Sequence, residues 1–220
     1  MKTQFTYLLF NLLVALPPLF VALFWPAYRW QAGDWYRLLK VYIFVSLPFM
    51  IIDSFIVSAG WWRYNPDYVL GTTLFTLPIE EILFFFSVPF ACLLLYRSLK
   101  ITVPRLDKIP SLTPARSTPI IWGLMILILL IFSPSPRTIL DAILASVVVG
   151  YMYYRQLFSQ LVVVWLSLIS GLFFIANTVL TALPIVIYNH QFGSSIRLGT
   201  IPVEDILYNL SLLLLCLLVF

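Results

Sequence analysis

Long apolar stretches dominate the chain, and short polar segments separate them. Seven stretches have the length of a helix, near residues 5–25, 38–60, 77–97, 119–133, 138–155, 160–182 and 202–220. A helix needs about 20 mostly apolar residues to cross the hydrocarbon core of a bilayer. The fourth and fifth stretches are shorter and meet at a proline-rich tight turn at 133–137. We predict an all-α integral membrane protein with about seven transmembrane helices.

The composition supports this class and excludes several others. Hydrophobic residues make up 62% of the 220 residues, charged residues make up 10%, and the mean hydropathy is +1.00. A soluble domain has about 45–50% apolar and roughly 25% charged residues, so this chain cannot cover a water-exposed surface with charge. Disorder is excluded because there is too much apolar surface. Two cysteines are too few for a secreted disulfide scaffold.

The distribution of lysine and arginine predicts the orientation. Four basic residues fall on one side of the predicted spans, namely Lys2, Arg63, Arg137 and Arg197. Nine fall on the other side, namely Arg29, Arg37, Lys40, Arg97, Lys100, Arg105, Lys108, Arg116 and Arg155. The side richer in basic residues faces the cytoplasm, so we predict an outer N-terminus and a cytoplasmic C-terminus in the cell (inner) membrane. The basic run 97–116 lies along a proline-rich linker and does not indicate nucleic-acid binding.

The chain contains an internal repeat with an offset of 124 residues. Residues 46–96 align with residues 170–220 without a gap, and 15 of the 51 aligned positions are identical. We predict two three-helix repeats, 1–100 and 137–220, joined by a linker and one connecting helix at 101–136. The extra helix makes the repeats parallel, so equivalent positions lie at the same depth in the membrane.

The repeat contains two acidic pairs, each just after a proline. Glu80 and Glu81 follow Pro78, and Glu204 and Asp205 follow Pro202. One explanation is local, because proline suits the first helical position and acids stabilise the first turn. However, each pair opens directly onto an apolar span, where acids are costly and face the interior of the bundle. Two carboxyl groups close together in a low dielectric cannot easily both ionise, so each pair is a candidate acid/base pair.

Other polar and aromatic residues recur around the acids. Tyr-Asn precedes each motif, as Tyr64-Asn65 and Tyr188-Asn189, and Phe84 and Tyr208 lie one turn after Glu80 and Glu204. Such aromatic rings can stabilise a cation or belong to the interfacial aromatic belt. The asparagines, together with Asp53 and Asn177, could orient the acids or make interhelical hydrogen bonds.

Other catalytic arrangements are not apparent in the sequence. The single histidine, His190, falls in a predicted loop, and no glycine-rich nucleotide loop or metal-ligand spacing is present. Cys92 and Cys216 lie among leucines and are typical of packing residues. We therefore expect no cofactor and no metal.

The doubled Pro-x-Glu-[Glu/Asp] motif, preceded each time by Tyr-Asn, resembles the membrane lycopene cyclase family. The chain is similar to the fused form of the heterodimeric bacterial lycopene β-cyclase, and to the archaeal and fungal cyclase domains. This resemblance implies β-cyclisation of the ψ-ends of lycopene to γ-carotene and then β-carotene, in carotenoid biosynthesis. It also implies catalytic roles for Glu80, Glu81, Glu204 and Asp205. The implied partners are lycopene and membrane lipids, with a homo-oligomer or other carotenoid enzymes as further candidates.

The chemistry of cyclisation suits these residues. A proton adds to C2 of the terminal alkene and leaves a tertiary cation at C1. The C5=C6 bond then attacks C1, the cation moves to C5, and a base removes the proton from C6. An alkene is a very weak base, so the acid must be desolvated and held against it. We expect Tyr64, Asn65, Phe84, Tyr188, Asn189 and Tyr208 to line the substrate site.

Three alternatives remain at this point. A proton-coupled small-molecule membrane transporter can also have parallel repeats with membrane acids. A related carotenoid ε-cyclase or hydratase would use the same protonation and end differently. A scaffold for carotenoid enzymes would leave the four acids without a role.

Overall fold

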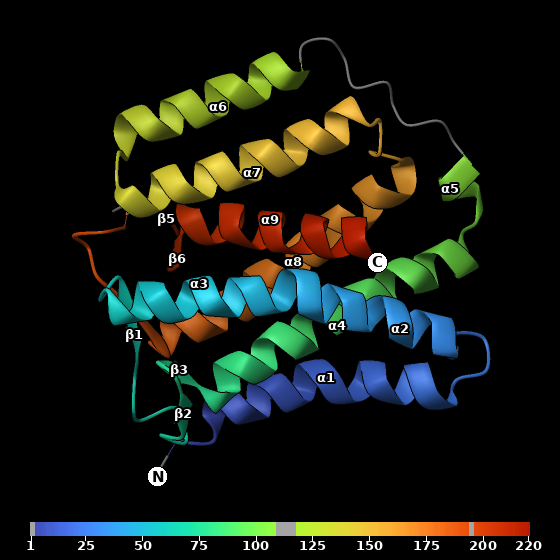
Figure 1. Ribbon diagram of the computed structural model, residues 1–220, viewed down its shortest axis with the longest axis horizontal. Helices are drawn as coiled ribbons and strands as arrows, with labels where there is room; N and C mark the ends of the chain where they lie inside the picture. The colour runs from blue at the N-terminus through green and yellow to red at the C-terminus, as the bar shows by residue number, and fades with distance from the viewer. Residues whose placement is uncertain (1–2, 109–117, 194–195) are drawn as a thin grey trace.

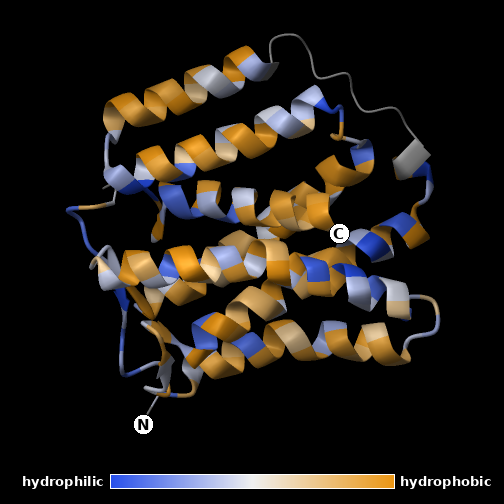
Figure 2. Ribbon diagram, viewed as in Figure 1, coloured by the Kyte–Doolittle hydropathy of each residue, from blue (hydrophilic) through white to orange (hydrophobic). Residues whose placement is uncertain are grey.

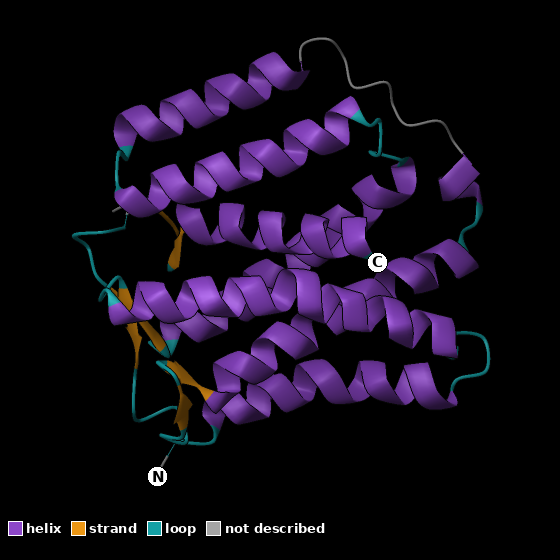
Figure 3. Cartoon of the chain, in the orientation of Figure 1, coloured by secondary structure: helices purple, strands orange, loops and turns teal. Residues whose placement is uncertain are grey.

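The structure is a computed structural model that describes residues 3–108, 118–193 and 196–220. Most of these residues are helical (Figures 1 and 3). The long segments are α1 (Thr6–Phe24), a continuous segment of α2 (Ala32–Val41), η1 (Tyr42–Ser46) and α3 (Leu47–Ser58), then α4 (Ile79–Thr102), α6 (Thr118–Phe132), α7 (Pro136–Tyr154), α8 (Gln160–Ala182) and α9 (Val203–Val219). A single turn, α5 (Arg105–Lys108), follows α4. Part of the predicted linker, residues 109–117, lies outside the described residues.

The helices match the predicted apolar stretches within two residues at each end, with two exceptions. The second segment begins at Ala32 rather than near 38, because a capping box formed by Gln31 and Asp34 starts a polar first turn that hydropathy does not detect. The third, α4, continues to Thr102 rather than ending near 97. The all-α prediction is confirmed, apart from short strands at one end.

Three small antiparallel sheets, which the sequence did not predict, lie at one end of the bundle (Figure 3). They pair β1 (Trp62–Tyr64) with β4 (Val186–Tyr188), β2 (Thr73–Leu74) with β3 (Leu77–Pro78), and β5 (Arg197–Leu198) with β6 (Ile201–Pro202). Pro78 and Pro202 end strands, and the helices begin one residue later, so neither proline occupies the first helical position. The β1–β4 sheet joins the first and second halves of the chain.

Elements of the second half lie 124 residues after those of the first. With this offset, strands β1, β2 and β3 correspond to β4, β5 and β6. In the same way, α4 and α9 begin at equivalent positions, and α3 and α8 end at equivalent positions. Helix α1 packs along α4, as α7 packs along α9. Both acidic helices begin at the same end of the bundle (Figure 1). These correspondences support the repeat, which stays a prediction.

The outer helix faces are apolar, as in a membrane protein (Figure 2). Four segments of the described chain are long and apolar enough to cross a bilayer, by length and composition: Thr6–Phe24, Ala32–Ser58, Ile79–Thr102 and Gln160–Ala182. Helices α6, α7 and α9 have 15, 19 and 17 residues.

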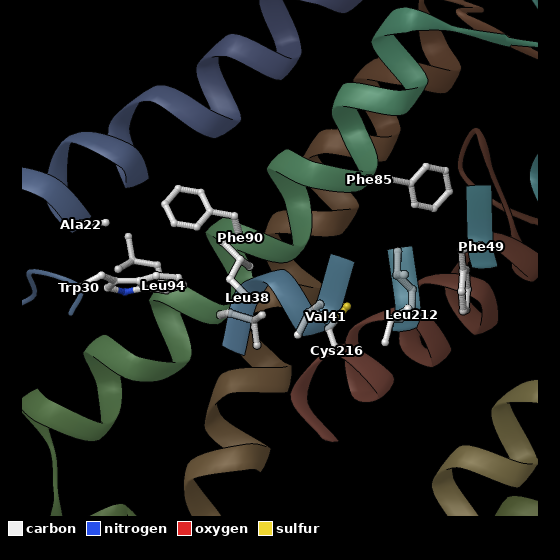
Figure 4. Packing of buried hydrophobic residues seen from close by; sticks show 12 residues of the cluster. Ala22, Trp30, Leu38, Val41, Phe49, Phe85, Phe90, Leu94, Leu212 and Cys216 are labelled. Atoms are coloured by element: carbon white, nitrogen blue, oxygen red, sulfur yellow. The ribbon is translucent and has the colours of Figure 1, made fainter. Parts of the chain in front are cut away.

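A proline inside α4 leaves a backbone carbonyl group available for a contact with another helix. Pro89 has no N–H to donate to the carbonyl oxygen of Phe85, four residues earlier in α4. The Ser46 hydroxyl donates to that oxygen at 2.8 Å, and the Tyr42 hydroxyl donates to the Phe86 carbonyl at 3.0 Å. Both donors lie in η1, a π-helical turn of the kind that often marks functional regions. Beside it, a buried cluster joins α2, α3, α4 and α9 (Figure 4).

Candidate active site

Six carboxyl groups are buried where the helices meet the small sheets. They belong to Asp53, Glu80, Glu81, Asp141, Glu204 and Asp205. The described residues include one buried cation, the guanidinium of Arg137. Burying a charge without a counter-charge is very costly, and the six carboxyl groups share this one buried cation. The site therefore gathers acidic side chains in apolar surroundings.

Glu80 is fully enclosed at the start of α4. Its Oε1 accepts a hydrogen bond from the Leu70 backbone N–H at 2.6 Å. Its Oε2 has no hydrogen-bond partner among the described residues. The Asn11 amide of α1 donates to the Glu80 backbone carbonyl at 3.0 Å, which fixes the first turn of α4 against α1. A buried carboxyl oxygen without a partner is an exception in native proteins, and a catalytic role is one explanation for it.

Glu81 is held by tyrosine rather than by a cation. The Tyr7 hydroxyl of α1 donates to Glu81 Oε2 at 2.6 Å. Tyr64 of β1 lies close enough to interact with the same carboxyl group. Burial, followed by the nearby carboxylates, raises the pKa of Tyr64 well above its usual value, so its hydroxyl stays neutral.

The second pair is held differently. Glu204 Oε1 accepts from the Thr138 hydroxyl of α7 at 2.8 Å. Asp205 Oδ1 accepts from the Arg137 guanidinium, and its Oδ2 accepts from the Asn177 amide at 2.9 Å and from the Tyr188 hydroxyl at 2.7 Å. Burial raises the pKa of Tyr188 well above its usual value, and the adjacent Asp205 carboxylate adds to this effect. Asp205 therefore accepts hydrogen bonds from three different side chains.

Arg137 is enclosed on several sides. Its guanidinium lies 4.8 Å from the ring centre of Trp62 and 4.9 Å from that of Tyr188. Its Nε lies 3.6 Å from Asp141 Oδ2 in the next turn of α7. The sequence analysis counted Arg137 among the four basic residues of one side, and the structure shows it buried within the first turn of α7, with only 6% of the residue exposed. The paired carboxylates and the two aromatic faces compensate for its desolvation.

The two halves meet through Asp53 and Tyr208. The Tyr208 hydroxyl of α9 donates to Asp53 Oδ1 of α3 at 2.9 Å, and the ring of Phe49 packs edge-on against Tyr208 at 5.2 Å. Asp53 and Glu81 are close enough to interact electrostatically, as are Glu81 and Asp205. The structure thus brings both acidic pairs into one cluster.

Two predicted substrate residues lie elsewhere. Asn65 and Asn189 form turns, in which each side-chain oxygen accepts the N–H two residues later, at Asp67 and Gln191. Neither amide has a described hydrogen bond to an acid. Phe84 packs against Phe85, with 5.9 Å between ring centres, and against the buried cluster that contains Tyr7, so it lies near the residues that hold Glu81. Tyr64, Tyr188 and Tyr208 do belong to the cluster.

Several site residues were missed by the sequence analysis. Tyr7, Asn11, Thr138 and Asp141 lie on helices adjacent to the acidic motifs and outside the aligned repeat. A usable signal existed, because polar and ionisable residues in membrane helices usually face the bundle interior.

Comparison with known proteins identifies the family. The sequence profile described as "Lycopene cyclase" matches residues 4–99 and 118–220, which is most of the chain. The chain belongs to the lycopene cyclase family. The family implies an enzyme of carotenoid cyclisation with a lipid-soluble carotenoid substrate.

One curated relative supports this membership. It is the "Bifunctional lycopene cyclase/phytoene synthase" of Arthroderma gypseum. The two sequences are 32% identical over 93 aligned residues. The match covers 41% of this chain and 15% of the fungal protein, so the chain corresponds to a small part of that relative. No solved structure matches the chain.

Proposed function

We propose that the protein is a lycopene β-cyclase, which converts the ψ-ends of lycopene to β-rings by acid catalysis without net redox change. Family membership supports the substrate class. The main structural support for this mechanism is the buried cluster of six carboxyl groups and one guanidinium group. An alkene accepts a proton only from an acid that is shielded from water, and the resulting cation survives only where water is excluded.

The first pair supplies the proton in this proposal. Glu80 and Glu81 have amide and hydroxyl neighbours in the described contacts, and no described cation pairs with either. In this proposal one of these two carboxyl groups bears the proton that is transferred. The unpartnered Oε2 of Glu80 gives this carboxyl group an oxygen whose proton is not held by a neighbour. Transfer of that proton to C2 leaves the cation at C1.

Asp205 completes the reaction. Attack of the C5=C6 bond on C1 forms the C1–C6 bond and moves the cation to C5. A tertiary carbocation is so acidic that even a weakly basic carboxylate can remove the proton from C6. Asp205 is the motif acid that forms an ion pair with the Arg137 guanidinium. Its negative charge would stabilise each cation before it accepts the proton.

We further propose seven membrane spans, formed by the long helical segments, with the acidic cluster near the outer face. The excess of basic residues on the opposite side supports an outer N-terminus and a cytoplasmic C-terminus. The matching element boundaries support two parallel repeats at 1–100 and 137–220. The substrate would then enter from the bilayer.

A lycopene-accumulating bacterial host tests the proposed function. Expression should convert lycopene to γ-carotene and β-carotene in extracted pigment. Glu80→Gln and Glu204→Gln should abolish this conversion with normal protein levels in the membrane. Asp34→Asn is the matched control, because this acid pairs with Arg97 at the opposite end of the bundle.

The outcomes separate the alternatives. Unchanged lycopene with wild-type protein in the membrane would refute cyclisation and favour a transporter. An ε-ring or a hydrated product would keep the protonation step and change the final one. Full activity of both glutamine variants would refute the assigned acids.

A further inference from the structure

An apolar groove of about 380 Å³ runs along the first half of the bundle. Its lining includes Leu12, Ala15 and Leu19 of α1, Leu38 of α2, and Leu83 and Phe90 of α4. With a rise of about 1.5 Å per residue, the stretch from position 12 to position 19 of α1 covers about 10 Å along the helix. Leu38 and Phe90 are among the side chains drawn in Figure 4.

The polar end of this groove lies beside the first acidic pair, separated from Glu80 by the residues that hold its helix turn. Asn11 and Ser87 line it there, and the Ser87 hydroxyl donates to Asn11 Oδ1 at 2.9 Å. Asn11 in turn donates to the backbone of Glu80. Glu80, Leu83 and Ser87 have the spacing i, i+3 and i+7, which places them on one face of α4. The groove therefore follows the same face of the helix as the carboxyl group.

The equivalent surface of the second half is covered. Leu207 lies 124 residues after Leu83, and it packs against Ala142 and Ala145 of α7 together with apolar side chains of α6. Leu83 is 37% exposed, whereas Leu207 is 8% exposed. Figure 1 shows α6 beyond α7 at one edge of the molecule, while α1 forms the opposite edge of the described chain. The fold thus has an open groove beside one acidic pair and a helix over the corresponding surface beside the other.

We propose that this groove binds one arm of a linear polyene, with its terminal alkene directed toward Glu80. The inference rests on the proposed function, and it adds where the substrate lies and how many ends react at a time. A volume of about 380 Å³ falls within the range of small-molecule pockets, about 300–1,000 Å³. The lining is apolar along its length and polar at the acid end, as an unsaturated hydrocarbon with one reacting end requires.

A single open groove has a consequence for the order of reaction. The two ends of lycopene must react in separate binding events, because the second acidic pair has α6 over the equivalent surface. The half-cyclised product must leave the groove, reverse its direction and bind again. Monocyclic carotenoid should therefore accumulate before bicyclic carotenoid when lycopene is in excess.

Filling the groove tests this assignment in the lycopene-accumulating host. Ala15→Trp should lower the rate of cyclisation by roughly 10²-fold, the loss expected when a substrate is displaced from its reacting geometry. The matched control is Leu13→Trp on the same helix, at a residue that is 74% exposed and does not line the groove; it should retain activity at equal protein level. Equal activity of the two variants would overturn the groove assignment and leave the cyclase function standing. An inactive wild-type protein would instead refute the proposed function.

Cysteine protection tests occupancy independently of activity. Leu12→Cys and Leu13→Cys are made in a chain with Cys92 and Cys216 replaced by alanine, and a membrane-permeant maleimide is applied. The Leu12 variant should react several-fold more slowly in membranes that contain lycopene than in carotenoid-free membranes, and the Leu13 variant should react equally in both. Equal protection at both positions, or none at either, would overturn the proposal. An unreactive Leu12 variant beside a reactive Leu13 variant in carotenoid-free membranes would also overturn it, because another protein segment would then cover the groove.

Discussion

Replacing Arg137 by glutamine tests the electrostatic account of the site most severely. The substitution removes the one buried cation among the described residues and leaves the carboxyl groups of Asp205 and Asp141 buried without it. Breaking a buried ion pair by removing one partner costs about 3–5 kcal/mol. At about 1.4 kcal/mol per factor of ten, the folded-to-unfolded ratio should fall by at least roughly 10²-fold.

A double-mutant cycle with Asp205→Asn isolates the pair. Asp205→Asn alone should destabilise less than Arg137→Gln, because the guanidinium keeps Asp141 and the faces of Trp62 and Tyr188. The double variant should be more stable than the sum of the two single effects predicts, since neither partner is then left charged alone. Arg137→Lys keeps the positive charge but loses the planar guanidinium with its paired N–H donors. Its stability should therefore lie between those of the wild type and Arg137→Gln.

The assay is unfolding of the detergent-solubilised protein, together with the conversion of lycopene in cells. Each variant that removes the charge pair should also lose cyclisation, because Asp205 is then neutral or misplaced. Additive destabilisation in the cycle would contradict the account. So would an Arg137→Gln protein with unchanged stability and activity.

Further outcomes follow from individual contacts. Tyr7→Phe removes the hydroxyl that donates to Glu81 and should lower cyclisation several-fold, since a typical hydrogen bond contributes roughly 0.5–1.5 kcal/mol; unchanged turnover would contradict this role. Ser46→Ala leaves the Phe85 carbonyl without its donor and should destabilise the protein by about 1–3 kcal/mol, as measured by unfolding. Burial raises the pKa of Tyr188, so this group stays protonated at pH values near 10, where an ordinary tyrosine titrates. Tyr188→Phe should then leave the tyrosinate absorbance of the folded protein at that pH unchanged, and a clear decrease would contradict its burial.

The sequence predicted the helices well because each apolar stretch is a local property of the chain. The second segment shows the limit, since its first turn is polar and Asp34 caps it. The short strands were not predictable, because two or three residues carry no detectable pattern. Strand β1, for example, forms only by pairing with β4. Its residue Trp62 pairs with Tyr188, which lies more than half the chain length away in the sequence.

The repeat identified the four motif acids but not the side chains that hold them. Tyr7 and Arg137 reach their carboxylates from helices that are distant in sequence and outside the aligned repeat. The repeat also implied two equivalent acidic pairs, whereas a tyrosine holds Glu81 and a guanidinium holds Asp205. This difference depends on side chains that the repeat does not share, so only the packed structure could reveal it.

The central claim is that buried carboxyl groups protonate the substrate. The most direct test is conversion of unlabelled lycopene by the reconstituted protein in deuterated buffer, followed by mass spectrometry of the carotenoids. The account predicts one deuterium for each ring formed, carried at C2, because the acid exchanges with solvent and the hydrogen lost from C6 comes from the substrate. Cyclic product without deuterium would contradict protonation by the buried acids.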